Sequence, residues 1–525
     1  MIKRSYKTVF KTASFPYEKV PFYFNIHINI IFSLTVSNYI GIITVIKGAN
    51  TMKKISLKVI SVIMVITLLC SLFAVSAVAA KTVDYKITNP YESVMAYIGS
   101  DANHYKTNLH THSTYSDANI NLEAMVKGHY NRDFDILGMA DHGVIGVPWN
   151  ETPTLLPLYY YNYVMLNNQK HLTDEEYEGI LNGTYRTDTT FRKNERGMQC
   201  VTGGIEANYL VMQKNHINGY FMKDNRVEGI AGNEGDFETM VKMIDEAGGI
   251  SHINHPGDWL SSADTTPVYD EEGNPVLDVN GEPMTKGKQI ATDPKNVQFF
   301  ANIYRKYDSC LGFEVYNAFD RPTRNDRVLW DEILKVVIPE GRNVWGFANN
   351  DAHRIDDIDT CFMDFVMPSY SMANVKTAME NGTFFAVSRY DGGDRIGNGD
   401  AYPQVTCITV DEDNDCITII GKNTDKINWI ADGKVIRTET KSVNGTVISK
   451  VYLREHTEDI SCYVRAELVG EGGVTLTQAF VCDDGNMASL INRGPAAPQQ
   501  VDIVALIRSF LKMILRTMTS FSVVE

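Results

Sequence analysis

The stretch ILGMADHG, from Ile136 to Gly143, is an apolar run that ends in an aspartate, a histidine and a glycine. An uncharged run of this length followed by a turn residue predicts a buried strand. Such a strand delivers the imidazole of His142 to its carboxyl-terminal edge, where Asp141 can orient that ring or a neighbouring side chain. One such ending is weak evidence for a site, but it recurs along the chain.

Three further apolar segments end in polar side chains of the same kinds. GGIE ends in Glu206 and is followed by His216; GISHINHPG contains His255; and FANNDAH ends in Asp351 and His353. The carboxyl-terminal ends of parallel strands share one rim in barrel-like α/β folds, so we expect these side chains to meet.

The segments between these motifs favour an α/β fold. Residues 122–130 and 237–247 have helical periodicity, whereas 136–140, 312–316 and 344–348 are typical of buried strands. Two stretches, Pro153–Met198 and Trp259–Asn296, look like insertions. The second has hairpin-like turn chemistry at Gly273-Asn274 and Asn280-Gly281.

The stretch NLHTH places His110 and His112 two residues apart. In an extended segment this spacing puts both imidazoles on one side of the backbone, and Asp117 follows closely enough to return a carboxylate to the same place. Imidazole and carboxylate ligands without thiolate suit zinc, manganese or iron, and a carboxylate such as Glu206 can bridge two ions.

The motifs HTHSTYSD, ILGMADHG, GGIEAN, NHINGY, INHPG, GFEVYN and NNDAH resemble, in order and spacing, the polymerase and histidinol phosphatase (PHP) superfamily over about Val83–Arg395. The resemblance implies a distorted (β/α)7 TIM-like barrel, three divalent metal ions (Zn, Mn or Fe) and phosphoester hydrolysis. The metal ligands that it implies are His110, His112, Asp117, His142, Glu206, His216, His255, Asp351 and His353.

The resemblance also implies roles in the reaction. Metal-activated hydroxide would attack the phosphoester. Asp351, His353 and His142 would be ligands that also shape the surroundings of the water, and either water or Asp141 would protonate the leaving group. An outer role falls to Glu314 and Asn317 in GFEVYN.

Substrate recognition departs from the family pattern at Asp258, where many relatives place a cation. Candidate replacements are Arg321, Arg324 and Arg354, because guanidinium groups suit phosphate. His252 is interpreted either as a packed histidine or as a substrate contact.

Composition limits the partners. The chain has 525 residues and a formal net charge of −15, which disfavours nucleic acid polymers. Its eight cysteines form no CxxC or CxxH pair, so a thiolate zinc finger has little support. One disulfide among Cys407, Cys416, Cys462 and Cys482 stays open.

The expected organisation has five parts. Residues 1–51 are an upstream segment, either not translated or a first membrane helix, and 52–80 form a signal peptide, with a retained membrane anchor as the alternative. The PHP domain spans 83–395, and short alternating runs over 402–485 predict an antiparallel β-sandwich domain. Residues 486–525 are a linker and an amphipathic basic helix, which docks on its own protein, on a membrane surface or on a partner helix.

The sequence therefore predicts an exported, secreted or cell-surface phosphoesterase that acts on a small phosphorylated substrate. Two alternatives stay open. One is an exported metal-dependent hydrolase of a carbohydrate or envelope substrate. The other is a surface binding protein that uses the barrel as a scaffold.

Overall fold

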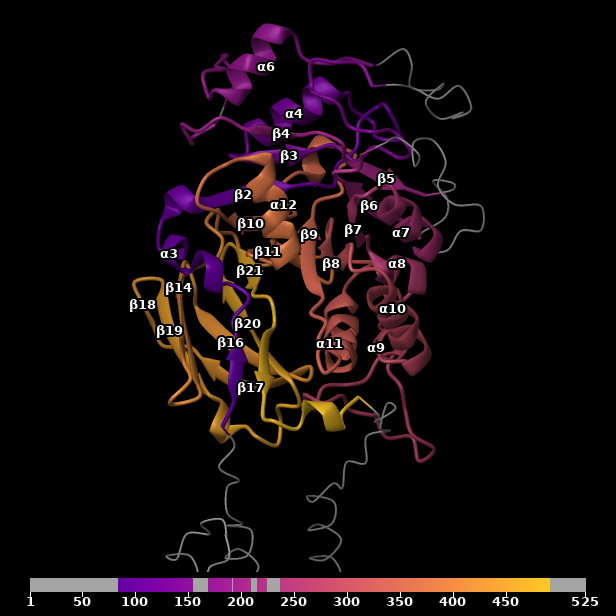
Figure 1. The fold of residues 1–525 in the computed structure, drawn as a ribbon, viewed down its shortest axis with the longest axis vertical. Coiled ribbons are helices and arrows are strands. Elements are labelled where there is room, and N and C mark those ends of the chain that lie inside the picture. Colours follow the sequence, from indigo (N-terminus) through magenta and orange to yellow (C-terminus); the bar gives the residue numbers. More distant parts are fainter. Residues whose placement is uncertain (1–83, 154–168, 191, 209–214, 224–236, 492–525) are drawn as a thin grey trace, which may run out of the picture. The chain divides into compact units, whose positions relative to one another are not determined.

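The computed structural model describes residues 84–153, 169–190, 192–208, 215–223 and 237–491 (Figure 1). These ranges belong to one compact unit, residues 82–525. The predicted upstream segment, the signal peptide and the tail from residue 492 lie outside the described residues, as does 154–168 of the first insertion. No helix in the described ranges is both long and apolar enough to cross a membrane.

Strands and helices alternate in the first part of the described chain. β2 pairs in parallel with β3, and β3 pairs in parallel with β4, so Ile136 lies between Thr107 and Gln199. The elements are β2 (His104–Asn108), α4 (Leu122–Tyr130), β3 (Ile136–Gly138), α6 (Asp174–Leu181) and β4 (Gln199–Val201). The helix predicted at 122–130 is confirmed.

A second sheet has the order β5-β6-β7-β8-β9. β6 runs antiparallel to β5 and β7, whereas β7, β8 and β9 are parallel. The strands are β5 (Ile205–Ala207), β6 (Ile217–Tyr220), β7 (Ile250–Ile253), β8 (Cys310–Asn317) and β9 (Trp345–Asn349). The buried strands predicted at 136–140, 312–316 and 344–348 are therefore present.

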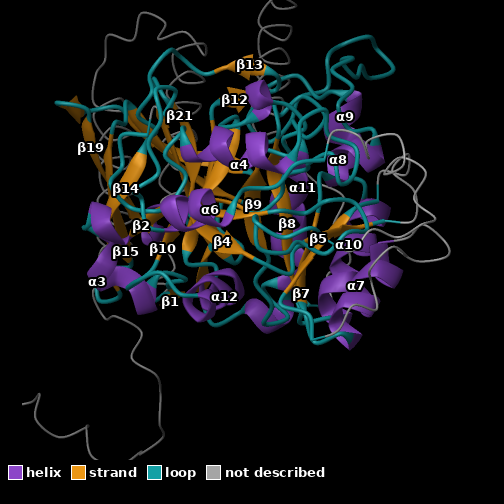
Figure 2. Ribbon diagram, turned by 90° about the horizontal axis from the view of Figure 1, so that it is seen from above, coloured by secondary structure: helices purple, strands orange, loops and turns teal. Residues whose placement is uncertain are grey.

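Helices cover the second sheet on one side, where α7 to α11 lie beside β5, β7 and β8 (Figure 2). In α7, Phe237, Met240, Val241 and Ile244 recur at helical spacing and all are buried. The helices are α7 (Phe237–Glu246), α8 (Pro256–Leu260), α9 (Lys286–Ala291), α10 (Pro294–Lys306) and α11 (Asp326–Val337).

Two isolated parallel bridges join the sheets just beyond the strand ends. Thr111 pairs with Ala352, and His142 pairs with Glu206. The ends of β2 and β3 therefore meet β9 and β5 in the region where the polar motifs lie. The predicted mixed α/β class is confirmed, whereas closure into a (β/α)7 barrel stays a prediction.

The sheet that contains β2 continues into the C-terminal region. It has eleven strands, in the order β1-β22-β20-β21-β11-β10-β2-β3-β4, with β16 paired to β20 and β17 paired to β16. The added elements are β10 (Cys361–Val366), α12 (Met372–Asn381), β11 (Phe384–Ser388), β16 (Lys426–Ala431), β17 (Lys434–Glu439), β20 (Tyr463–Gly470), β21 (Gly473–Leu476), β22 (Phe480–Asp483) and, from the start of the described chain, β1 (Lys86–Thr88).

A four-stranded antiparallel sheet packs on this C-terminal part. It comprises β14 (Gln404–Asp411), β15 (Cys416–Lys422), β19 (Thr446–Tyr452) and β18 (Ser442–Val443). Ile417 and Val451 from this sheet share a buried core with Trp429 and Leu468 from the larger one. The antiparallel strands predicted after Gln404 are confirmed. The boundaries of the predicted PHP and β-sandwich domains stay a prediction. β1 belongs to the first of these domains and β22 to the second, and the two strands pair with each other.

Smaller features complete the fold. α3 (Met95–Ile98) contacts β14, and β12 (Tyr390–Asp391) with β13 (Asp394–Arg395) forms a short hairpin. In the insertion after Trp259, the turns predicted at Gly273 and Gly281 are confirmed by antiparallel bridges and positive φ angles. All seven described cysteines are unpaired, so no disulfide forms among the last four.

Candidate metal centre

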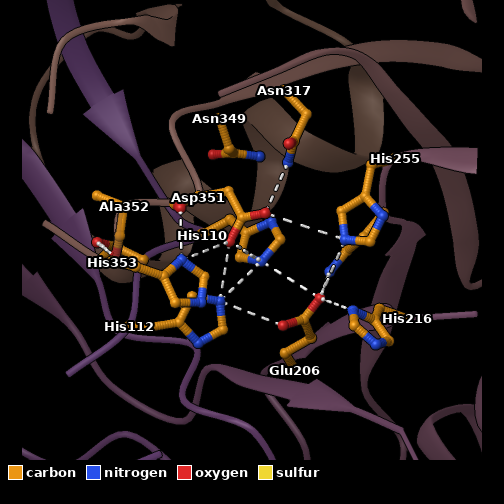
Figure 3. Close-up of polar contacts among 12 residues, drawn as sticks. His110, His112, Glu206, His216, His255, Asn317, Asn349, Asp351, Ala352 and His353 are labelled. Carbon is orange, nitrogen blue, oxygen red and sulfur yellow. Dashed lines mark hydrogen bonds and ion pairs between the residues drawn. The ribbon is translucent and has the colours of Figure 1, made fainter. Parts of the chain in front are cut away.

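Histidine and carboxylate side chains converge where the two sheets meet (Figure 3). We call this set the ligand cluster: His110, His112, Asp117, His142, Glu206, His216, His255, Asp351 and His353. Most members follow the carboxyl-terminal end of a strand. His216 instead precedes β6, but β6 is antiparallel to its neighbours, so its start lies beside the ends of β5 and β7.

Glu206 occupies the middle of the ligand cluster. Its side chain is 1% exposed, and each oxygen faces more than one imidazole. The distances from Oε1 are 2.9 Å to His216 Nδ1, 3.3 Å to His110 Nε2 and 3.6 Å to His255 Nε2; those from Oε2 are 3.1 Å to His142 Nδ1 and 3.2 Å to His112 Nε2. A carboxylate in this position can bridge two cations.

Asp351 faces Glu206 across the first two histidines. Its Oδ1 lies 3.0 Å from Nε2 of His112 and 3.2 Å from Nε2 of His110, and its Oδ2 lies 4.0 Å from Nε2 of His255. The backbone of Asp351 has a φ of 46°. A non-glycine residue in this conformation is strained, and such strain is typical of functional sites held by their surroundings.

Asp117 forms a second carboxylate position at the more open side. Its Oδ1 lies 3.2 Å from Nε2 of His353, and its Oδ2 lies 3.6 Å from Nε2 of His142. The ligand atoms fall into three groups with all atoms within 4.8 Å of one another. They are His112, Asp117, His142 and His353; His110, His112 and Glu206; and His142, Glu206 and His216.

The contacts in the ligand cluster fit cations better than hydrogen bonds. Nε2 of His110 and Nε2 of His112 lie 3.1 Å apart, although at most one hydrogen can occupy that contact. Oδ1 of Asp351 is buried and close to both nitrogens but forms no hydrogen bond of normal geometry. Nitrogen and oxygen donors that face one another in this way suit zinc, manganese or iron.

The charges of the ligand cluster depend on one another. Burial would raise the pKa values of Glu206 and Asp351, but the surrounding imidazoles hold both well below the usual range. Burial likewise opposes protonation of His112, yet Asp351 and Glu206 outweigh it and raise its pKa to about 10. His142 shows the opposite balance, since burial lowers its pKa to about 3.

A second layer of side chains holds the ligands in place. The carboxylate of Glu314 can only accept, so Nδ1 of His110 donates to its Oε1 at 2.8 Å, leaving Nε2 for the ligand cluster. Glu314 also accepts from Asn349 at 2.9 Å, from Asn317 at 2.9 Å and from the backbone N–H of His255 at 3.2 Å. The structure thus places Glu314 and Asn317 in the outer position that the sequence predicted.

Asp141 lies behind the ligand cluster. Its carboxylate accepts from the backbone N–H of Ser113 at 2.6 Å, from Ser113 Oγ at 2.8 Å and from Ser116 Oγ at 2.7 Å. These bonds brace the turn between His112 and Asp117. The contacts of Asp141 are those of a positioning residue, and its role in leaving-group protonation stays a prediction.

Sequence reasoning missed two asparagines. Nδ2 of Asn254 donates to Oε1 of Glu206 at 2.7 Å, and Oδ1 of Asn208 lies 3.2 Å from Nδ1 of His142. Both stand inside the motifs INHPG and GGIEAN. Their positions next to ligand-bearing strand ends were therefore a usable signal.

The four predicted substrate-binding side chains do not join the ligand cluster. Arg354 donates to Asp357, Arg324 donates to the carbonyl of Gly392, and Arg321 lies beside Gly393. His252 is buried and stacks on Phe347 with ring centroids 4.5 Å apart. Among the described residues, none of these four side chains bonds to a member of the ligand cluster, and their substrate roles stay predictions.

No family model and no curated protein matches this sequence. Three solved structures are similar to it at low identity. A two-domain protein from Bacteroides vulgatus, containing a predicted PHP-like metal-dependent phosphoesterase, shares 13% identity over 72% of this chain and 95% of its own, with a TM-score of 0.32. PsfC from Pseudomonas syringae shares 13% identity over 51% of this chain and 84% of its own, with a TM-score of 0.27.

The third is the lesion-specific endonuclease PfuEndoQ from Pyrococcus furiosus, with 12% identity over 53% of this chain and 56% of its own, and a TM-score of 0.25. Similarities this low do not assign a family or an activity.

Proposed function

We propose that this protein is a metal-dependent phosphoesterase whose ligand cluster holds three divalent ions. The observation that carries the proposal is the central position of Glu206, whose two oxygens face five imidazoles within 3.6 Å. The three ligand groups support three adjacent cation positions. Each of Glu206, His112 and His142 belongs to two of these groups, so each can connect two neighbouring positions. The order and spacing of the motifs support phosphoester hydrolysis as the reaction.

The residues that would hold the ions are the members of the ligand cluster. When bound, clustered divalent ions lower the pKa of water and neutralise charge on a phosphoryl group. The surrounding protein fixes the ligands. Glu314 sets the tautomer of His110, Asn254 holds Glu206, and Asp141 braces the turn that carries Asp117.

The proposal also covers the barrel fold, the location of the protein and its substrate. The bridges between Thr111 and Ala352 and between His142 and Glu206 support closure of the strands into a distorted (β/α)7 barrel. Export rests on the signal-like segment 52–80 alone, and contact with a membrane surface rests on the basic periodicity of the tail. The proposed substrate is a small phosphorylated molecule rather than a nucleic acid polymer, because the net charge is −15.

One observation favours the alternative of a carbohydrate or envelope substrate. Trp259, four residues after His255, is 37% exposed and stacks on Phe299 with centroids 5.3 Å apart. Exposed aromatic rings are suited to stacking on apolar ligand faces. A sugar phosphate would be a substrate consistent with both the phosphoesterase and the carbohydrate alternative.

The test is phosphate release from a panel of phosphomonoesters and phosphodiesters by the protein from Lys81 onward, supplied with Mn or Zn. Asp351→Ala should abolish turnover with the fold retained. Asp356→Ala, at an exposed aspartate in the short 3-10 helix Ile355–Asp357 that follows His353, is the matched control and should leave turnover unchanged. Failure across the panel, with metals bound, would instead favour the carbohydrate hydrolase or the binding scaffold.

A further inference from the structure

A charged cavity lies apart from the ligand cluster. Its volume is about 580 Å³, within the usual range for small-molecule sites. Its lining comes from the segments 101–106, 131–135, 193–196, 389–404 and 422–423, together with Asp359 before β10. Lys106 projects into it from the face of β2 opposite to Tyr105 and Thr107, and no member of the ligand cluster lines it.

The lining carries more positive than negative side chains. Seven of the eighteen lining residues are Lys or Arg and five are Asp. This surplus stands against a formal net charge of −15 for the whole chain. A cavity lined by one excess sign concentrates ions of the opposite sign.

The ion pairs of the cavity leave part of the positive charge uncompensated. Asp359 is shared by two cations, with Lys106 Nζ at 2.6 Å from Oδ1 and Arg389 Nε at 3.1 Å from Oδ2. In the described part of the chain, the lining cations Arg132, Lys193 and Arg395 form no ion pair. The lining carboxylates Asp133 and Asp400 form none either, so seven cations against five carboxylates leave a surplus of two positive charges.

Two of the cations are fixed before any ligand arrives. The side chains of Lys106 and Arg389 are 11% and 6% exposed. The amine of Lys106 also lies 4.4 Å from the ring centroid of Phe134 and 4.6 Å from that of Phe362. Arg389 donates to the carbonyl of Gly472 at 2.8 Å. Side chains ordered in this way lose little entropy on binding.

From this geometry we infer that the cavity binds a small anion that carries a phosphate group. Lys193 and Arg395 reach it as exposed donors, Arg132 adds a third cation, and Lys106 and Arg389 supply positive charge from the floor. Cations around a compact anion form charge-assisted hydrogen bonds, and the fork of an arginine matches phosphate oxygens. The inference does not depend on the proposed hydrolysis, because the two sites share no residue.

The experiment is calorimetric titration of the full-length protein with inorganic phosphate. The double variant Lys193→Gln and Arg395→Gln should bind phosphate about tenfold more weakly, since it loses two charge-assisted contacts. The matched control is Lys295→Gln with Lys450→Gln, which removes equal charge from exposed positions outside the lining. The control should retain the affinity of the parent.

Phosphate bound at the ligand cluster is common to all three proteins and cancels in the comparison. Equal phosphate affinity in the double variant and the control would overturn the inference. Citrate is titrated in parallel. If the double variant loses citrate binding but keeps phosphate binding, the inference is also overturned, because the cavity would then bind carboxylates. Thermal unfolding of each variant without phosphate verifies that the exposed substitutions leave the fold intact.

Discussion

Oε1 of Glu314 lies 2.8 Å from Nδ1 of His110, on the edge of the ring opposite to the nitrogen that faces Glu206 and Asp351. Such a carboxylate fixes the tautomer and raises the basicity of a metal-binding imidazole. We expect Glu314→Gln to weaken metal affinity by about 10- to 100-fold with the fold retained. Metal titration with a competing chelator measures this, and an unchanged affinity would mean that Glu314 is only a packing residue.

Replacing the central carboxylate, Glu206, should reduce metal binding more than replacing Glu314. Glu206→Gln removes the negative charge between five imidazoles, so we expect fewer bound ions per chain and a loss of turnover of at least about 100-fold. Elemental analysis of the purified variant gives the metal content. Glu271→Gln, on the exposed part of the second insertion, is the charge-matched control and should keep the full content.

Metal binding should release protons. In the metal-free protein, burial opposes protonation of His112 and His255, but nearby carboxylates raise their pKa values to about 10 and about 9. Both imidazoles are therefore protonated at pH 7 and must lose a proton to bind metal. Apparent metal affinity should rise with pH up to about 9 to 10, and calorimetry in buffers of different ionisation enthalpy should detect the released protons.

The same shifts predict the stability of the metal-free protein. A raised pKa in the folded state contributes stability that is complete below the unfolded value of 6.5 and is lost as pH rises through the folded value. The Tm of the metal-free protein should therefore fall between pH 7 and pH 10. A Tm that stays level over this range would show that the two histidines are not protonated at neutral pH.

A buried ion pair ties α11 to β20. Nε and one terminal nitrogen of Arg465 each donate to Asp331 at 2.7 Å, and both side chains are at most 5% exposed. Asp331→Ala leaves the guanidinium buried without its partner, so we expect a loss of about 3–5 kcal/mol of unfolding free energy in urea. Glu332→Ala, which breaks only a more exposed pair with Lys335, should cost less than about 1 kcal/mol.

The candidate site was largely predictable because short sequence patterns determine where most of its side chains lie. Period-two alternation predicted that His110 and His112 face the same way, and their Nε2 atoms lie 3.1 Å apart. The polar endings of buried strands predicted one rim, and the structure brings all the predicted ligands to it. Helices such as α4 and α7 followed from apolar spacing alone.

The rest depends on contacts between distant segments. The antiparallel direction of β6 and the pairing of β2 with β10 follow from the packing of the whole sheet, which no local pattern carries. Asp141 is predicted to orient the His142 ring or a neighbouring side chain, and its carboxylate accepts hydrogen bonds from Ser113 and Ser116 in another loop, a choice that no local pattern decides. Arg321, Arg324 and Arg354 are close to the motifs in sequence, but closeness in sequence does not decide where a long side chain points.

The pairing of β1 with β22 affects how the protein is made. The backbone N–H of Gln478 donates to the hydroxyl of Tyr91, 387 residues away, and Lys86 lies opposite Asp483. At about 5–20 residues per second, the ribosome needs roughly 20 to 80 seconds to synthesise the chain between them. Throughout that interval β1 lacks its partner strand, and its unpaired backbone groups are open to pairing with other chains. Pairing of β1 with β22 is thus one of the last steps in the synthesis and folding of the protein.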